Sequence, residues 1–225
     1  MNRNYHAFCA MLLAFVLILV MCSQFVKDTF AKASTDKVVY LTFDDGPSDR
    51  VTPKILDVLK EEDVKATFFI VGCAAESRKY LLEREFSEGH TVAVHSYSHE
   101  YSQIYSSAEN LLADIDRCNE IIKGVTGSYS SLYRFPGGSF GLSDKLIDAV
   151  KARGMKYIDW NASVCDAEYY CAPSEILYHN AVDTSMGHDN VILLAHDSTA
   201  KITTAEALKD IIKYFKSQKY KFATL

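Results

Sequence analysis

Two short segments of this chain place acidic and imidazole side chains in a spacing suited to metal-assisted hydrolysis. The first is Thr42-Phe43-Asp44-Asp45-Gly46, in which two adjacent carboxylates follow an apolar stretch, and the second is His95-Ser96-Tyr97-Ser98-His99. One carboxylate and two imidazoles can hold one divalent metal ion and leave coordination positions for water and substrate. The second carboxylate is then free to accept a proton from that water.

Each pair also has a simpler interpretation. Asp-Asp-Gly-Pro is typical of a turn, and histidines four residues apart are often ordinary surface or core residues. Both pairs follow segments that read as strands of one sheet, and this coincidence favours a metal site.

Two further segments carry candidate site residues. In Arg134-Phe135-Pro136-Gly137-Gly138-Ser139 the glycines let the backbone approach a ligand, so that its N–H groups can face a developing oxyanion. Arg134 can pair with a carboxylate and lower its pKa. The segment Leu193-Leu194-Ala195-His196-Asp197 ends an apolar run with an imidazole suited to general acid catalysis. A surface arginine and a structural histidine are the alternatives.

The alternation of strand-like and helix-like segments predicts an α/β fold. Strands are expected at Val38–Phe43, Ala66–Val71, Thr91–Val94, Tyr133–Phe135, Lys156–Trp160, Val191–Ala195 and Lys221–Leu225. Helices are expected at Pro53–Glu62, Arg78–Ser87, Ala108–Gly124, Ser143–Arg153, Ser174–Met186 and Thr204–Gln218, with Ser143 as an N-cap. Such repeats predict a parallel sheet closed, or nearly closed, into a barrel with its chemistry at the carboxyl ends of the strands.

The N-terminal segment differs from the rest of the chain. Arg3 is the only charged side chain before Lys27, and Phe8–Val20 is almost wholly apolar. The uncharged window reaches the roughly 20 residues that span a bilayer, and with Ala31-Lys32-Ala33 it also fits a secretory signal peptide. We therefore expect residues 1–33 to be a signal peptide or a retained membrane anchor, 34–37 a linker, and 38–225 an extracytoplasmic catalytic domain.

Charge and cysteine content limit the partners. The net charge of −5 and the absence of a Lys/Arg cluster argue against a nucleic-acid-binding surface. The sequence indicates no protein partner. The cysteines beyond the leader are Cys73, Cys118, Cys165 and Cys171. We expect free thiols, with a Cys165–Cys171 bridge as the open alternative.

The order T-F-D-D-G, H-S-x-x-H, R-F-P-G-G and L-x-H resembles the polysaccharide deacetylase family, carbohydrate esterase family 4, over about Val38 to Leu225. The resemblance implies a distorted (β/α) barrel and one divalent metal, Zn²⁺ or alternatively Co²⁺. By this resemblance the metal ligands are Asp45, His95 and His99. Asp44 is the general base, and Arg134 orients it. The Gly137 N–H holds the oxyanion, His196 protonates the leaving group, and Leu194 lines the pocket for the acetyl methyl group.

The chain departs from the family pattern in two places. Many relatives have an Asp supporting the catalytic His and a Trp along the groove. Here Asp166 is the expected partner of His196, with Asp159 as the second choice, and Trp160 either borders the groove or, as we favour, packs in the core. Gly137 also stands where many relatives have Tyr, which would open the groove.

The expected activity is removal of N-acetyl groups from an extracellular bacterial polysaccharide, foremost the N-acetylglucosamine of cell-wall peptidoglycan. An O-acetyl esterase and a deacetylase of chitooligosaccharide or exopolysaccharide remain open alternatives. A non-catalytic carbohydrate-binding relative would lack a ligand, base or acid, and all are present. The apolar leader argues against a cytoplasmic amidohydrolase of the same fold.

Overall fold

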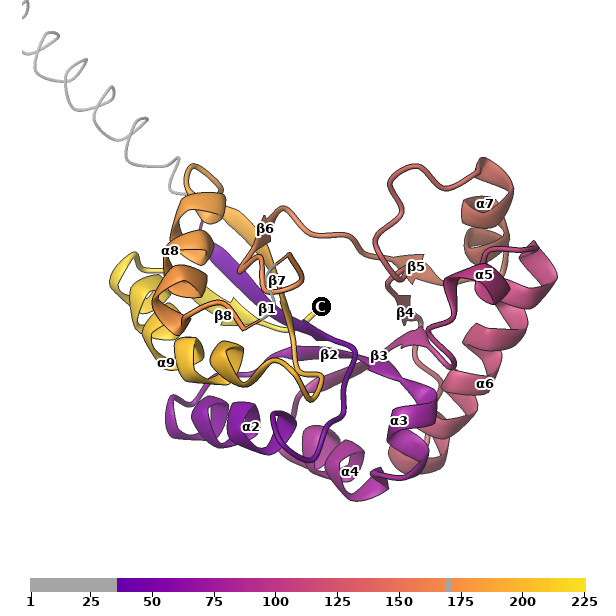
Figure 1. The fold of residues 1–225 in the computed structure, drawn as a ribbon, viewed down its shortest axis with the longest axis horizontal. Helices are drawn as coiled ribbons and strands as arrows, with labels where there is room; N and C mark the ends of the chain where they lie inside the picture. Colours follow the sequence, from indigo (N-terminus) through magenta and orange to yellow (C-terminus); the bar gives the residue numbers. More distant parts are fainter. Residues whose placement is uncertain (1–35, 169–170) are drawn as a thin grey trace, which may run out of the picture. The chain divides into compact units, whose positions relative to one another are not determined.

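Parallel strands form one curved sheet in the computed structural model, which describes residues 36–168 and 171–225 (Figure 1). The strands are β1 Val38–Asp44, β2 Thr67–Val71, β3 Thr91–Ser96, β4 Leu132–Tyr133, β5 Lys156–Tyr157, β6 Ala162–Ser163, β7 Asn190–His196 and β8 Lys221–Ala223. Their order is β5-β4-β3-β2-β1-β7-β6. Strand β7 pairs along the whole of β1, whereas β8 pairs with its first three residues and β2 with its last three.

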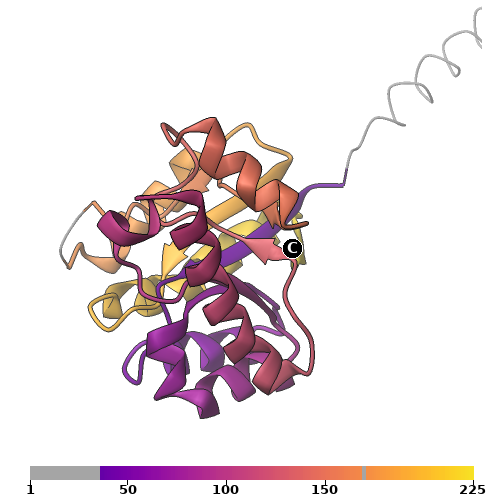
Figure 2. The same cartoon turned by 90° about the vertical axis from the view of Figure 1, so that its right-hand side faces the viewer.

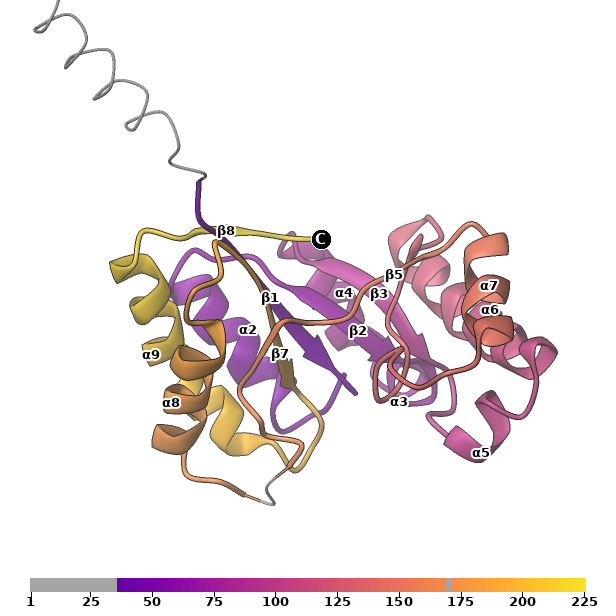
Figure 3. The same ribbon diagram turned by 90° about the horizontal axis from the view of Figure 1, so that it is seen from above.

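Helices cover the outer face of this sheet (Figures 1 and 3). They are α2 Thr52–Glu61, α3 Gly72–Glu76, α4 Lys79–Ser87, α5 Tyr101–Ile104, α6 Ala108–Thr126, α7 Asp144–Ala152, α8 Ser174–Ser185 and α9 Ile202–Ser217. Helix α9 packs against α8 and α2, and α6 packs against α3, α4, α5 and α7. The long α6 is seen along its length in Figure 2.

The strands separate the core from the site by simple alternation, because successive side chains point to opposite faces. On β1, Val39, Leu41 and Phe43 are buried in the large apolar core beneath the helices. Thr42 and Asp44 point to the other, inner face. A second, smaller apolar cluster of Phe69, Ala93 and Ile158 fills that inner face. Polar side chains at the carboxyl ends of the strands lie beyond it.

The fold class is confirmed as a distorted (β/α) barrel. Among the described residues β5 and β6 pair with β4 and β7 and not with each other, so the barrel is open between them. The expected long strands and helices are present. The short elements α3, α5 and β6 were not predicted, because segments this brief carry no periodicity.

Two short strands differ from their predicted bounds. The strand expected at Lys156–Trp160 ends at Tyr157, and the carbonyl oxygen of Ile158 accepts a hydrogen bond from Arg134 Nε at 2.9 Å. The strand expected at Tyr133–Phe135 is Leu132–Tyr133. Ser143 is the N-cap residue of α7, as predicted, although its side chain makes no capping hydrogen bond.

The predicted leader, residues 1–33, lies outside the described part of the chain. Within residues 36–168 and 171–225 no helix has the length and apolar character needed to cross a membrane. Cys73, Cys118, Cys165 and Cys171 are free thiols in this structure.

Candidate metal and acid–base site

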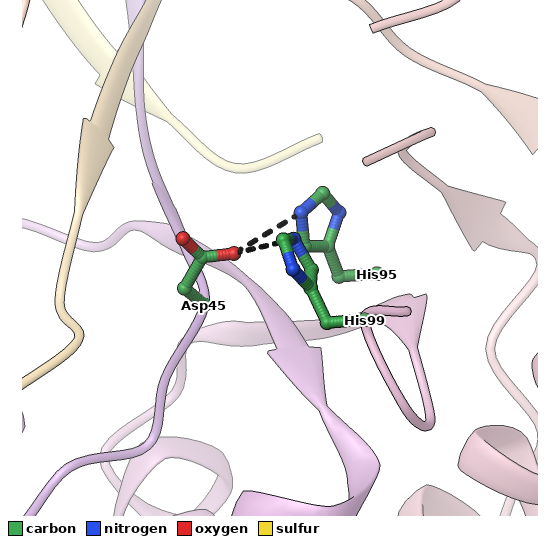
Figure 4. A group of neighbouring side chains, drawn as sticks. All are labelled: Asp45, His95 and His99. Carbon is green, nitrogen blue, oxygen red and sulfur yellow. Dashed lines mark ion pairs between the residues drawn. The ribbon is translucent and has the colours of Figure 1, made fainter. Parts of the chain in front are cut away.

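Asp45 and the two predicted histidines converge at the carboxyl ends of β1 and β3 (Figure 4). Asp45 Oδ1 lies 3.3 Å from His95 Nε2 and 3.1 Å from His99 Nε2. The backbone explains this convergence. Asp45 directly follows β1 and has φ 73°, so it leaves the extended conformation and can face the same site as Asp44. His99 lies three residues beyond the end of β3 and has φ 58°.

The donor atoms suit a divalent cation. His95 Nδ1 donates to the Arg134 carbonyl oxygen at 2.8 Å, so Nε2 is the ring nitrogen that faces Asp45 and would bind a cation. Asp45 Oδ1 is buried and has no hydrogen-bond partner. Burial opposes ionisation of Asp45, but its contacts with His95 and His99 hold its pKa well below the usual range. Ligand atoms around a tetrahedral zinc at ~2.0–2.1 Å would lie about 3.3 Å apart, close to the separations seen here.

Asp114 of α6 holds the loop that carries His99, a role that no motif in the sequence indicated. Its Oδ1 accepts from Ser96 Oγ at 2.5 Å and from the Tyr97 N–H at 2.7 Å. Its Oδ2 accepts from the Ser98 N–H at 2.9 Å and Ser98 Oγ at 2.7 Å. Ser96 Oγ in turn accepts from the His99 N–H at 2.8 Å. The carboxylate thus fixes the turn between the two imidazoles.

Asp44 is oriented by a fully buried arginine. Arg134 Nη1 donates to Asp44 Oδ1 at 2.9 Å and to Thr42 Oγ1 at 2.7 Å. Asp44 Oδ2 lies 4.0 Å from His95 Nε2. One carboxylate oxygen is therefore held by Arg134, and the other faces the metal ligands, where it can accept a proton.

His196, at the end of β7, pairs with Asp166 rather than Asp159. Its Nδ1 lies 2.7 Å from Asp166 Oδ1, and its backbone N–H donates to Oδ2 at 2.9 Å. Burial disfavours the charged imidazole, but the hydrogen bond and charge of Asp166, together with Asp44 and Asp45, raise the pKa of His196 to about 9. The imidazolium therefore persists at neutral pH, and its Nε2 can donate a proton into the site.

The loop after β4 presents a free backbone donor. The Gly138 N–H donates to the Phe135 carbonyl at 2.8 Å, and Gly137 has φ 78°, as required of the third residue of a type II turn. Gly137 is exposed, and its N–H makes no hydrogen bond within the described part of the chain. Asp159, the second choice for His196, instead accepts from Ser139 N–H at 3.0 Å and from its hydroxyl.

Trp160 and Leu194 lie near these groups. Trp160 is half-buried and belongs to neither apolar core cluster of the described residues, so the favoured core placement was wrong. The Arg134 guanidinium carbon lies 5.7 Å from the centre of its ring. Leu194 is buried and is the register partner of Thr42 in the neighbouring strand.

A buried carboxyl group supports the Asp44–Asp45 turn from behind. Asp197 Oδ2 accepts from Thr52 Oγ1 at 2.5 Å, and its N–H donates to the Asp44 carbonyl at 3.1 Å. A Cβ on Gly46 would overlap this carboxyl group, so only glycine fits there. Burial and the charges of Asp45 and Asp44 raise the pKa of Asp197 to about 7. Asp197 directly follows His196 in the sequence, and this adjacency could have indicated that it lies near the site.

The chain is similar to known proteins in sequence and in fold. The family model described as polysaccharide deacetylase matches residues 31–158. A peptidoglycan-N-acetylglucosamine deacetylase of Bacillus cereus is 33% identical over 191 residues, covering 83% of this chain and 68% of that protein.

Two solved structures are similar as well. The catalytic domain of a peptidoglycan N-acetylglucosamine deacetylase from Eubacterium rectale has a TM-score of 0.78 and 36% identity, covering 85% of this chain and 90% of that one. A Streptococcus mutans CE4 esterase has a TM-score of 0.79 and 33% identity, and the match covers 85% of this chain and 87% of that one. The fold, the motifs and these matches agree: the chain belongs to the polysaccharide deacetylase family of hydrolases.

Proposed function

We propose that this chain is a zinc-dependent deacetylase that acts outside the cytoplasm on the N-acetylglucosamine of peptidoglycan. The observation that carries the proposal is one cluster with three separable parts. Asp45, His95 and His99 converge on one point, Asp44 lies beside them, and His196 ends the adjacent strand. A ligand set, a base and an acid are what hydrolysis of an unreactive amide needs.

The residues of the chain have distinct parts in the reaction. A cation held by Asp45, His95 and His99 would polarise the acyl oxygen and make water more acidic. Asp44 Oδ2 accepts the proton of the attacking water, while Arg134 keeps Oδ1 occupied. The Gly137 N–H donates to the acyl oxygen as negative charge develops there.

His196 completes the reaction. An amine leaves poorly unless its nitrogen is protonated, and His196 supplies that proton from Nε2. Asp166 holds Nδ1–H, which fixes the ring and favours the charged form. The products are acetate and the free amine of the sugar.

The substrate and location rest on the relatives and on the leader. The Bacillus cereus and Eubacterium rectale proteins are named for peptidoglycan N-acetylglucosamine, and the apolar run at Phe8–Val20 would direct the domain across the membrane. Zinc suits a mixed imidazole and carboxylate site, with Co²⁺ as the alternative. An O-acetyl ester is easier to cleave, so the same groups would also serve an esterase.

The decisive experiment compares acetate release from peptidoglycan, N-acetylglucosamine oligomers and acetylxylan by purified zinc-loaded protein. We expect the highest kcat/KM on peptidoglycan and one zinc ion per chain. His95→Ala should lose both the ion and the activity, because it removes a ligand. Release of acetate from acetylxylan without release from either amide substrate would make the protein an esterase. Failure to bind zinc would remove the basis of the mechanism.

Location is tested separately. A reporter that is active only in the cytoplasm, joined after Leu225 of the full chain, should give no signal. A signal from that fusion would contradict an extracytoplasmic site of action.

A further inference from the structure

The space that a side chain on residue 137 would need is filled by Tyr101. A Cβ placed on Gly137 would lie 3.1 Å from the Tyr101 hydroxyl oxygen and 3.2 Å from ring carbon Cε1. Tyr101 comes from α5, which follows the His99 loop, whereas Gly137 lies in the loop after β4. A residue from one loop thus occupies the place left open by glycine in another.

Two contacts set the position of Tyr101. Its ring lies edge-on to the His99 ring, with centroids 5.4 Å apart, and edge-on to Tyr105 at 5.8 Å. The Tyr105 hydroxyl donates to the Pro136 carbonyl oxygen at 2.7 Å, next to Gly137. Helix α5 is therefore tied to the Gly137 loop, and Tyr101 lies between a metal ligand and the proposed oxyanion donor.

The polar end of Tyr101 is available to a ligand. The residue is 48% exposed, although its ring packs edge-on against His99 and Tyr105. Its hydroxyl makes no hydrogen bond to any part of the chain that the structure describes. By contrast, the hydroxyls of Tyr105 and the exposed Tyr129 are both engaged within the protein.

We propose that Tyr101 is a substrate-binding residue whose hydroxyl donates a hydrogen bond to a sugar oxygen of the N-acetylated residue being processed. The proposal rests on the proposed deacetylase function and adds a specificity group to it. The acyl oxygen already has the Gly137 N–H and the ligand cluster beside it. The Tyr101 hydroxyl lies next to Gly137 and has no partner in the described part of the chain, so it can donate a hydrogen bond to the sugar that carries the acyl group.

The first test replaces the hydroxyl alone. Tyr101→Phe should keep one zinc per chain and lower kcat/KM for N-acetylglucosamine oligomers about 3- to 10-fold, the usual effect of one hydrogen bond. On an aryl acetate, which has no sugar, its rate should equal that of the wild type. Tyr129→Phe, an exposed tyrosine outside the site, should match the wild type on both substrates.

Equilibrium binding of the oligomer, measured by calorimetry, separates this proposal from the proposed function. If the wild type releases no acetate but binds the oligomer more tightly than Tyr101→Phe, the deacetylase function fails and the role of Tyr101 stands. If the wild type is active and Tyr101→Phe equals it in rate and binding, the role of Tyr101 fails alone. Equal losses on oligomer and aryl acetate, or no oligomer binding by wild type, would also overturn it.

A double-mutant cycle tests whether the two residues compete for one space. Gly137→Ala strains the backbone in any background, because φ at this position is 78°. When Tyr101 is present, the added methyl group also clashes with the Tyr101 ring. Gly137→Ala should therefore reduce kcat/KM by a larger factor in the wild type than in Tyr101→Ala. Equal factors in the two backgrounds would show that Tyr101 does not fill the space beside residue 137.

Discussion

Asp44 of β1 and His196 of β7 are register partners in adjacent parallel strands, and the Asp197 N–H that follows His196 donates to the Asp44 carbonyl oxygen at 3.1 Å. Neighbouring strands lie about 4.8 Å apart. The proposed base and the proposed acid are thus fixed by sheet pairing, and they can be altered separately without moving the strands that carry them.

The Asp44→Asn variant should keep both its fold and its bound zinc, but its kcat should fall about 100- to 10,000-fold. The amide keeps the shape of the side chain and lacks its basicity. Zinc content by elemental analysis and kcat by acetate release measure the two effects. Loss of the metal from Asp44→Asn would mean that Asp44 is a ligand rather than the base.

His196→Ala should separate amide from ester chemistry. It removes the proton donor, so hydrolysis of the N-acetyl group should fall about 100- to 10,000-fold. The loss should be much smaller on an aryl acetate, whose leaving group needs little protonation. Parallel kcat measurements on the two substrates decide this, and equal losses would rule out His196 as the leaving-group acid.

Asp166→Asn should move the alkaline limb of the pH profile to lower pH. The wild-type limb should lie near pH 9, because Asp166 and the other nearby carboxylates raise the pKa of His196 to about 9. Without the Asp166 charge that pKa should fall by about one unit or more. The quantity to follow is kcat/KM from pH 6 to 10, and an unchanged limb would show that another group controls it.

The same pair also contributes to stability, with a defined sign. A histidine whose folded pKa is raised stabilises the fold fully below its unfolded value of about 6.5. That contribution is lost as the pH rises through about 9. The difference in unfolding free energy between wild type and Asp166→Asn should therefore shrink between these two pH values.

Asp114→Ala should weaken zinc binding about 10- to 100-fold, as loss of a supporting partner usually does, because it releases four hydrogen bonds around the His99 loop. Competition with a chelator gives the affinity. Asp116→Ala is the matched control, since Asp116 lies on the same helix and pairs with Arg153 at the surface. Equal affinities for the two variants would contradict the role of Asp114.

Glu85→Met should stabilise the protein at neutral pH. Glu85 is fully buried in α4, and neither carboxylate oxygen has a hydrogen-bond partner. Burial, with the Asp197 charge second, raises its pKa well above the usual range. The folded chain thus holds a proton that the unfolded chain releases, so stability falls as the pH rises above about 4.3.

Removing the carboxyl group should raise the free energy of unfolding by about 1–3 kcal/mol at pH 7.5. Each kcal/mol corresponds to a rise of roughly 2–4 °C in Tm. The gain should be smaller at pH 4, where most of the unfolded chain also carries the proton on Glu85. Thermal unfolding followed by circular dichroism at both pH values provides the measurement. Glu83→Met, an exposed position on the same helix, should change Tm little, and a Tm gain independent of pH would contradict the explanation.

The sequence predicted the parts of this molecule that are periodic or adjacent in the chain. The apolar runs gave β1 and β7, and the residues directly after them gave Asp44 and His196. It ranked Asp166 first as the partner of His196 and kept Asp159 as the second choice, because the outcome depends on where the chain goes after β5 ends at Tyr157. Asp114 and Tyr101 act through loops that meet only in the folded barrel, so no spacing along the chain could reveal them.

The two halves of the site differ in how firmly they are anchored. Asp44 and His196 are bound into the strand ladder, whereas His99 follows β3 in a loop and is 30% exposed. Loops open at lower free energy than core strands, so mild heating should release the ion before the sheet loosens. Early thermal inactivation would then be reversed on cooling with added zinc, and the enzyme's working temperature would depend on the free zinc of its surroundings as well as on its melting point.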